Sequence, residues 1–485
     1  MRWRMDQVAG TLGVAVPPGV VRMARLAGVS IDSRTIAVGE LFVAIRGPRH
    51  DGHNYVASAL EQGALAAIVA RENVASYAES VRGRCLPVAN TLAALHQLAR
   101  AVRQAWARKL AGVTGSVGKT TTKEILAALL GARIRVLKSE GNLNNEYGLP
   151  LTLLRLEETH EAAVLEMGMS RPGELRRLAE LARPDVGVVT RIAPVHLEFF
   201  PSVEAIGQAK RELIEGLEGK DSVAVLNADD SRVAALAEAA PGHVIRYGFS
   251  PQAAFRAERI EDRGAFGSDF DFVGPEGRAR LGLAIPGRHA IANALAALAA
   301  ASVWGVGQEE AQRVFPELRP VSMRGELVRF EDGSALINDA YNSNPEALAA
   351  MMELLAATPG FRRRILAAGE MLELGPESAK LHREMGQKAA TTRAMDWLIG
   401  VQGNAREFVE GAVAAGHSRS RARFFATSAE AAGFVAQLAK PGDLLLVKGS
   451  RGVKMECIVE ALLARQNSAG RTGKAPASPL AEAQH

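Results

Sequence analysis

The chain has 485 residues, of which 48% are hydrophobic, and a formal net charge of +5 at pH 7. At about 150 residues per domain, this length predicts three globular domains, and so small a charge excess gives no indication of a nucleic-acid-binding protein. No uncharged stretch reaches the roughly 20 residues of a membrane helix, and Cys85 and Cys457 are too far apart in sequence for a metal-binding motif. We expect a cytoplasmic monomer that does not insert into membranes.

Residues 1–108 alternate short β-like runs with helical runs, which predicts a small α/β domain. Several polar residues lie in the loops between these runs, where binding faces are usually built. They are Ser33, Arg34, Asp51, Gly52 and His53. From the residues alone, ordinary turn and capping roles remain the alternative.

A phosphate-binding loop follows between an apolar run and a helical run. Its residues are Gly115, Ser116, Val117, Gly118, Lys119, Thr120 and Thr121. The glycines let backbone N–H groups close around phosphate oxygens, Lys119 supplies a positive charge, and Thr120 offers a hydroxyl to Mg²⁺. The full eight-residue motif is incomplete because Val113 replaces its first glycine. We expect Mg²⁺ and a nucleotide to bind here.

Residues 109–320 alternate strand-like and helical runs, which predicts a mostly parallel sheet covered by helices on both faces. Glu166, His196 and Asn227 follow apolar runs and should therefore lie at the carboxyl edge of that sheet, beside the phosphate loop. Glu166 is suited to hold Mg²⁺. A lone histidine such as His196 is more often structural than a metal ligand.

Asparagines mark two further stretches of this central region. Asn142, Asn144 and Asn145 lie among turn residues and could either shape the turn or bind a substrate. Asn293 lies about one turn inside an alanine-rich helical run, where asparagine is a poor helix former, which favours a functional side chain.

Residues 321–465 begin a second strand–helix alternation and predict another α/β domain. Asn344 and Pro345 are suited to begin a helix there, as its N-cap and first residue. Residues 466–485 are polar and rich in small residues, so we expect a disordered tail.

Taken together, these stretches resemble the Mur ligase family, the ATP-dependent enzymes that add amino acids to the peptidoglycan precursor. Within that family the motifs are most similar to the branch that joins D-alanyl-D-alanine to UDP-N-acetylmuramoyl-tripeptide. The matching stretches are 115–124, 141–145, 148–150, 166–168, 196–198, 338–345, 371–375, 381–384 and 447–451.

The resemblance implies an α/β protein of three domains: a UDP-sugar-binding N-terminal domain at 1–108, a central ATP-binding domain at 109–320 and a Rossmann-like C-terminal domain at 321–465. It implies that the five loop residues of the first domain contact the UDP-sugar. Thr120 and Glu166 become ligands of a first Mg²⁺, and His196 of a second.

The same resemblance assigns nucleotide contacts to residues on either side of the expected domain junction. Asn293 corresponds to a position that meets the adenine, and Arg324 to an arginine near the ATP phosphates. Asp339 corresponds to a carboxylate near the ribose, while Tyr341 and Asn342 would face the nucleotide from the C-terminal domain.

Lys210 matches a lysine that is carbamylated in several family members. A carbamate carries a negative charge that Mg²⁺ attracts, whereas an unmodified ammonium would be repelled. From sequence alone, a solvated helix lysine is the alternative. Glu370 and Val117 depart from the usual family residues, aspartate and asparagine, without removing a required donor or ligand.

The implied reaction is amide formation through an acyl phosphate, with Lys119, Lys210, His196 and Arg324 in catalytic roles. Two alternatives remain open at this point. One is another amide ligase of the same plan, such as folylpolyglutamate synthase. The other is a binding protein that is switched by ATP and makes no product.

Overall fold

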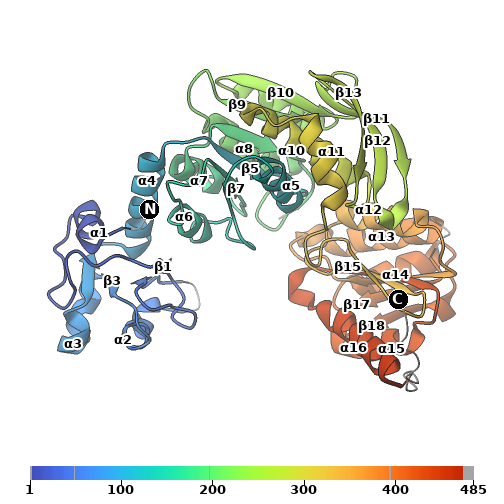
Figure 1. Cartoon of the computed structure of the whole chain (residues 1–485). Coiled ribbons are helices and arrows are strands. Elements are labelled where there is room, and N and C mark those ends of the chain that lie inside the picture. The colour runs from blue at the N-terminus through green and yellow to red at the C-terminus, as the bar shows by residue number, and fades with distance from the viewer. Residues whose placement is uncertain (1–2, 48–49, 196, 393–394, 473–485) are drawn as a thin grey trace, which may run out of the picture.

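The computed structural model describes residues 3–47, 50–195, 197–392 and 395–472. Three sheets follow one another along the molecule, and the chain passes from the first to the third without returning (Figure 1). The strands of these sheets lie within residues 29–88, 110–283 and 326–448. The expected α/β fold class is confirmed.

The first sheet has four parallel strands in the order β1-β2-β3-β4. Its strands are β1 (Val29–Ser30), β2 (Leu41–Val43), β3 (Ala66–Ala70) and β4 (Cys85–Val88). Its helices are α1 (Met5–Leu12), α2 (Val56–Glu61), α3 (Glu79–Arg82) and α4 (Thr91–Trp106). Helix α4 packs Leu95 and Leu98 into this domain's core and Val102 and Trp106 into the next one, so it joins the two domains.

The central sheet has nine strands in the order β13-β12-β11-β10-β9-β8-β5-β7-β6. It is parallel from β6 to β11, and β12 and β13 are antiparallel additions. The strands are β5 (Leu110–Thr114), β6 (Val136–Lys138), β7 (Ala162–Glu166), β8 (Val186–Val189), β9 (Val223–Asn227), β10 (His243–Gly248), β11 (Phe255–Asp262), β12 (Ser268–Gly274) and β13 (Gly277–Leu283). The helices are α5 (Lys119–Gly131), α6 (Gly148–Leu153), α7 (Glu174–Ala182), α8 (Val203–Glu215), α9 (Ser231–Ala234), α10 (Arg288–Ala301) and α11 (Gln308–Val314).

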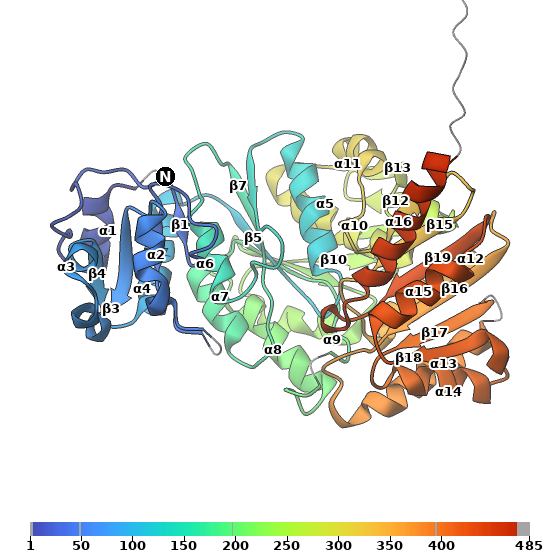
Figure 2. The same cartoon turned by 90° about the horizontal axis from the view of Figure 1, so that it is seen from below.

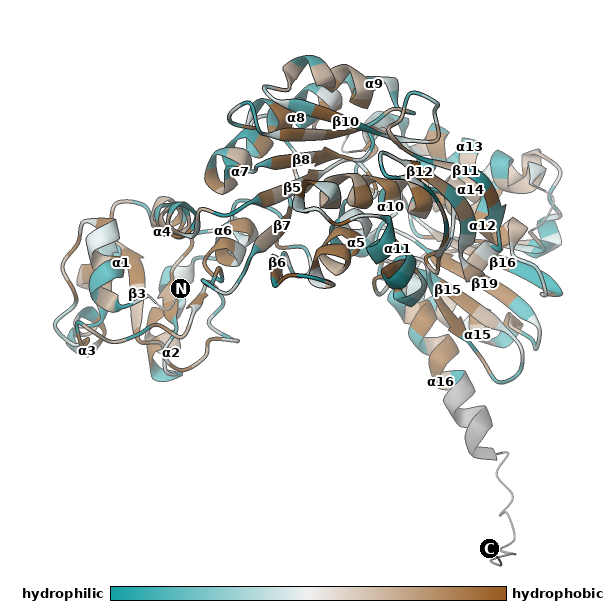
Figure 3. Cartoon of the chain, turned by 45° about the horizontal axis from the view of Figure 1, so that its top comes forward, coloured by the Kyte–Doolittle hydropathy of each residue, from teal (hydrophilic) through white to brown (hydrophobic). Residues whose placement is uncertain are grey.

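Both faces of the central sheet are covered at its centre, because the strands β5, β7, β8 and β9 bury every one of their residues. In β5, Ala111 and Val113 join the core under α5 and α10, while Leu110 joins the core under α7 and α8. Successive strand residues point to opposite faces, so a continuous apolar run needs helices on both sides. Hydrophobic residues accordingly concentrate along β5, β7 and β8 inside the domain (Figure 3).

The third sheet has six strands in the order β14-β15-β19-β16-β17-β18, parallel except for β14. The strands are β14 (Glu326–Arg329), β15 (Ala335–Asp339), β16 (Arg363–Gly369), β17 (Trp397–Val401), β18 (Ala422–Phe425) and β19 (Asp443–Lys448). The helices are α12 (Pro345–Ala357), α13 (Ser378–Thr391), α14 (Ala405–Ala414), α15 (Ser428–Leu438) and α16 (Glu456–Thr472). Asn344 caps α12 as predicted, since its Oδ1 accepts the Ala347 N–H at 2.8 Å.

The disordered tail expected at 466–485 is wrong for residues 466–472, where the backbone of helix α16 continues, and residues 473–485 lie outside the described residues. No proline interrupts the sequence between residues 456 and 472, so nothing there forces the helix to end earlier. Within the described ranges, none of the helices combines the length and apolar character needed to cross a bilayer.

Candidate active site

A cleft of about 880 Å³ lies between the central and C-terminal domains. The two domains face each other there when the molecule is seen from below (Figure 2). Residues from distant parts of the sequence meet in its walls, because the carboxyl ends of β5, β7 and β15 all point toward it. The predicted residues that line it are Ser116, Val117, Gly118, Lys119, Thr120, Thr121, Asn144, Asn145, Glu166, Asn293, Arg324, Asp339, Tyr341 and Asn342.

The two glycines of the phosphate loop have no room for a side chain. Gly115 has φ +151°, and a Cβ there would lie 1.8 Å from Thr190 Oγ1. Gly118 has φ +86°, and a Cβ there would lie 2.3 Å from Oδ1 of Asn293, which reaches over from α10. Both positions therefore require glycine. The loop connects β5 directly to α5, whose first residue is Lys119, as the sequence pattern predicts.

Lys119 curls back over the loop, and its Nζ donates to the carbonyl oxygens of Gly115 at 2.7 Å and Ser116 at 3.4 Å. Burial lowers its pKa, with Glu166 opposing the shift and Arg324 adding to it. Among the described residues, no carboxylate forms an ion pair with this ammonium. The charge is therefore available to an anion that enters the loop.

Thr120 and Glu166, two of the predicted metal ligands, lie in contact. Thr120 Oγ1 donates to Glu166 Oε2 at 2.7 Å, and Asn144 Nδ2 donates to Glu166 Oε1 at 2.8 Å. Glu166 is 3% exposed and receives an ion pair from no described residue. A buried carboxylate that is held by neutral donors alone still lacks a countercharge, so this pair fits a cation.

The remaining predicted ligand, His196, lies outside the described residues. Within the described part of the chain, no three His, Cys, Asp or Glu side chains are grouped closely enough to hold a metal ion by themselves. A metal at Glu166 would therefore complete its coordination with ligands such as the Thr120 hydroxyl, water and substrate oxygens.

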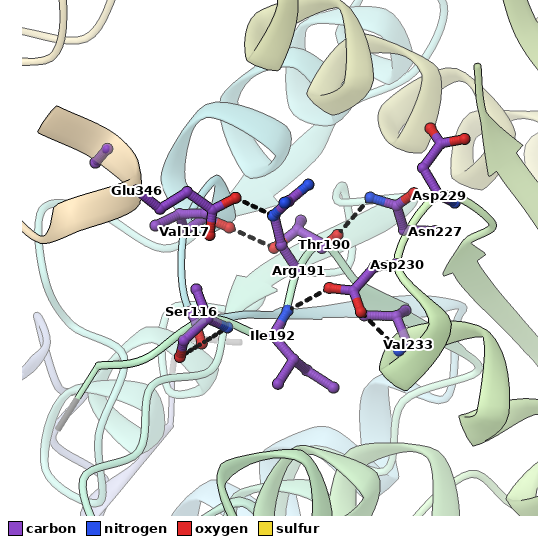
Figure 4. A network of polar contacts seen from close by, with 12 residues as sticks. Ser116, Val117, Thr190, Arg191, Ile192, Asn227, Asp229, Asp230, Val233 and Glu346 are labelled. Atoms are coloured by element: carbon purple, nitrogen blue, oxygen red, sulfur yellow. Dashed lines mark hydrogen bonds and ion pairs between the residues drawn. The ribbon is translucent and has the colours of Figure 1, made fainter. Parts of the chain in front are cut away.

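The segment after β8 holds the phosphate loop from behind (Figure 4). Ser116 N–H donates to the Arg191 carbonyl oxygen at 2.7 Å, and Thr190 Oγ1 donates to the Val117 carbonyl oxygen at 2.5 Å. Ile192 N–H donates to Asp230 Oδ2 at 2.9 Å. These bonds fix the loop before any ligand binds, which reduces the ordering cost of binding.

The C-terminal domain contributes charged and aromatic groups to the opposite wall. Lys448, 2% exposed, donates from Nζ to Asp339 Oδ2 at 2.5 Å and to the Asn342 carbonyl oxygen at 2.9 Å. The Arg324 guanidinium stacks on the Tyr341 ring, 4.1 Å from its centroid. These contacts order the segment after β15 and hold Arg324 at the cleft.

Lys210 lies on α8 and is 2% exposed, which excludes the solvated lysine considered from the sequence. Burial, together with the Lys119 ammonium, lowers its pKa well below the ordinary value. Within the described residues, its ammonium has no ion-pair partner. It does not line the cleft.

Six of the predicted substrate-binding residues lie outside the wall of this cleft. Arg34 is exposed and pairs with Asp32 at 2.6 Å. His53 is buried with both ring nitrogens used: Nδ1 donates to Asp51 at 2.6 Å, and Nε2 accepts the Ala70 N–H at 2.9 Å. The residues outside the cleft wall are Ser33, Arg34, Asp51, Gly52, His53 and Asn142.

Several residues of the cleft have no clear signal in the amino-acid sequence. Arg191 forms an ion pair with Glu346 across the two domains, and the Arg288 guanidinium stacks on Phe249, 4.1 Å from the ring centroid. Arg191 comes two residues after the end of β8, and this place near the carboxyl end of a parallel strand is the one feature of the sequence that could have indicated a site residue. The other pairings depend on tertiary contacts that have no local pattern.

Family models match three consecutive parts of the chain. They are the Mur ligase family catalytic domain at residues 25–103, the Mur ligase middle domain at 113–301 and the Mur ligase glutamate ligase domain at 323–451.

Whole relatives match as well. The UDP-N-acetylmuramoyl-tripeptide–D-alanyl-D-alanine ligase of Bacillus subtilis is 35% identical over 436 residues, which cover 90% of this chain and 93% of the relative. A crystal structure of MurF from Acinetobacter baumannii aligns with a TM-score of 0.84 at 28% identity, covering 96% and 99% of the two chains. MurF from Thermotoga maritima, in complex with ADP, aligns with a TM-score of 0.78 at 29% identity, covering 91% and 98%. The chain belongs to the Mur ligase family.

Proposed function

We propose that this protein is the ATP-dependent ligase that joins D-alanyl-D-alanine to UDP-N-acetylmuramoyl-tripeptide, which gives the pentapeptide precursor of peptidoglycan. The observation that carries the proposal is the cleft, where a preformed phosphate loop and the Thr120–Glu166 pair face Arg324 and Asp339. The 35% identity to a ligase of this specificity over 90% of the chain supports the choice of substrates.

The reaction begins with transfer of the γ-phosphoryl group of ATP to the terminal carboxylate of the tripeptide. Lys119 lies in the loop that receives the phosphates and neutralises the charge that spreads over the transferring oxygens. Thr120 and Glu166 would hold Mg²⁺, which supplies further charge neutralisation at these oxygens. The acyl phosphate that forms has phosphate as a leaving group.

The amine of D-alanyl-D-alanine then attacks the acyl carbonyl and displaces phosphate. Its pKa is about 8, so a useful fraction is neutral near physiological pH and no strong base is needed. Lys119 and Arg324 face this centre from opposite walls and stabilise the oxyanion of the tetrahedral intermediate. Enclosure between the two domains protects the acyl phosphate from water.

In this proposal Asn293 meets the adenine and Asp339 the ribose, while Tyr341 and Asn342 face the nucleotide from the C-terminal domain. Asn293 lies against Gly118, and the other three form the facing wall of the same cleft. His196 would hold a second Mg²⁺.

Lys210 is proposed to be carbamylated. A neutral amine reacts with CO₂ to give a carbamate and a proton, and the lowered pKa of Lys210 increases the fraction of neutral amine at neutral pH. The negative charge gained would also relieve the repulsion between Lys210 and Lys119. The carbamate would then attract the metal from the side of α8.

The N-terminal domain is proposed to bind the UDP-sugar. The Arg34 guanidinium is 85% exposed and so is accessible to a diphosphate. Asp51 and His53 are engaged with each other, and Gly52 packs against Ile45 backbone, so this loop would present backbone groups and shape rather than ring nitrogens. We also propose a cytoplasmic location, since ATP and UDP-linked precursors are available in that compartment, and a monomer, since one chain supplies both walls of the cleft.

Phosphate release from ATP, measured with each substrate alone and with both together, tests the function. We expect release only when UDP-N-acetylmuramoyl-tripeptide and D-alanyl-D-alanine are both present, with one amide formed per phosphate. Release that does not depend on the dipeptide would refute the ligase, and release driven by a folate and glutamate would instead indicate the folylpolyglutamate synthase alternative.

A further inference from the structure

Helix α12 contacts the central domain at both of its ends. Just beyond its C-terminal end, Thr358 Oγ1 accepts the Ala265 N–H at 3.0 Å. In its first turn, Glu346 forms an ion pair with Arg191. The helix has 13 residues, so at about 1.5 Å per residue the two contacts are separated by about 20 Å.

The Thr358 contact is buried and tightly packed. Thr358 is 0% exposed, and Ala265 belongs to the hydrophobic core of the C-terminal domain although it lies in the turn between β11 and β12 of the central domain. A Cβ on Gly264 would lie 2.5 Å from Thr358 Cα, so nothing larger than glycine fits there. This end of α12 therefore serves as a fixed anchor between the domains.

The Glu346 contact is polar and accessible to water. The Glu346 and Arg191 side chains are 32% and 47% exposed. Pairs of this kind are worth little energy and break readily. The C-terminal end of α12 is thus held by buried packing at Thr358, whereas its first turn is held by an ion pair that can break.

The Arg191 backbone links this ion pair to the phosphate loop. Its carbonyl oxygen accepts the Ser116 N–H at 2.7 Å, and the next residue, Ile192, is bound through its N–H to Asp230 at 2.9 Å (Figure 4). Glu346, in the C-terminal domain, therefore binds the side chain of the same residue, Arg191, whose backbone supports Ser116. From the first turn of α12, Glu346 and Ala347 line the same cleft.

We propose that Arg191 and Glu346 are positioning residues that hold the first turn of α12 against the phosphate loop, so that both walls of the nucleotide site form together. The inference rests on the proposed function for its kinetic consequences, but not for the domain arrangement itself. A rotation of about 10° around the Thr358 anchor would move Glu346 by roughly 3 Å, which is enough to separate the charged groups.

Because of the nearby Asp230, loss of the Arg191 charge and loss of the Glu346 charge should have different effects. Burial raises the Glu346 pKa, Arg191 lowers it, and the nearby Asp230 carboxylate raises it further. Arg191 thus lies near two carboxylates that belong to different domains. Without the Arg191 charge, the Glu346 and Asp230 carboxylates repel each other across the two domains, whereas loss of the Glu346 charge leaves no such repulsion.

The test compares Arg191→Gln, Glu346→Gln and the double variant. We expect Arg191→Gln to raise the KM for ATP about 3- to 10-fold with a smaller change in kcat, because fewer molecules have both walls assembled. Glu346→Gln should have a smaller effect, and the double variant should resemble Glu346→Gln rather than Arg191→Gln. Small-angle X-ray scattering without nucleotide should show a larger radius of gyration for Arg191→Gln alone.

The matched control is Arg232→Gln with Glu204→Gln, an exposed Arg–Glu pair at 2.9 Å within the central domain. It should change neither the scattering nor the KM. Wild-type behaviour of Glu346→Gln, together with equal effects of Arg191→Gln and the double variant, would overturn the proposal, because Arg191 would then act on the nucleotide without Glu346. Unchanged scattering for Arg191→Gln would also overturn it. Scattering does not require turnover, so it tests the arrangement even where the ligase activity is absent.

Discussion

Replacement of Lys119 by methionine tests two effects of its positive charge. One is the effect on the free energy of unfolding of the free protein, and the other is the stabilisation of the transition state. Methionine keeps an unbranched apolar side chain of similar length, and the ammonium that donates to the Gly115 and Ser116 carbonyl oxygens is lost. Burial lowers the Lys119 pKa, so the charge is unfavourable in the folded protein. The free energy of unfolding of Lys119→Met should therefore equal or exceed that of the wild type.

The catalytic loss should be large. An ammonium about 3 Å from a phosphate oxygen, at an effective dielectric constant of about 20, gains about 5 kcal/mol. Part of this gain is offset by the desolvation that lowers the pKa. A net loss of about 3–4 kcal/mol of transition-state stabilisation corresponds to roughly 10²- to 10³-fold in kcat/KM.

The assay pairs steady-state amide formation with urea denaturation, and the exposed Lys220→Met on the same domain is the control. Wild-type kcat/KM in Lys119→Met would refute the assignment of this lysine to phosphate transfer. A marked drop in its unfolding midpoint would refute the argument that the charge is unfavourable in the free protein.

Three further predictions concern other positions. The pKa of Lys210 is lower in the folded protein than in the unfolded chain, so at pH values between the two the unfolded chain binds more protons. The free energy of unfolding should therefore rise with pH up to about 10.4, the ordinary lysine pKa. Urea denaturation in bicarbonate-free buffer should show a weaker rise for Lys210→Met than for the wild type. Gly118→Ala should cost about 1–3 kcal/mol of unfolding free energy and weaken ATP binding, since φ is +86° and Asn293 blocks a Cβ; normal binding would contradict this. Thr120→Val, which leaves Glu166 Oε2 unpaired, should raise the Mg²⁺ concentration for half activity about 10-fold or more, and an unchanged Mg²⁺ titration would remove Thr120 from the metal site.

Local sequence determined the elements and one half of the site. Gly115 to Thr121 must form a loop between a strand and a helix, because the glycines allow positive φ and the flanking residues have the required periodicity. Glu166 had to lie beside that loop, because the carboxyl ends of parallel strands share one edge of a sheet. Asn344 and Pro345 fixed the start of α12 through capping and a preset φ.

Tertiary structure alone decided which side chains meet and how exposed they are. Lys210 has the local sequence of an ordinary helix lysine, and only the packing of α8 buries it and lowers its pKa. The sequence left His53 open to either a turn role or a ligand contact, and only the folded structure shows that Asp51 and the Ala70 N–H occupy both of its ring nitrogens. Arg191 and Glu346 are 155 residues apart and share no pattern, because their contact depends on how two separately folded domains dock.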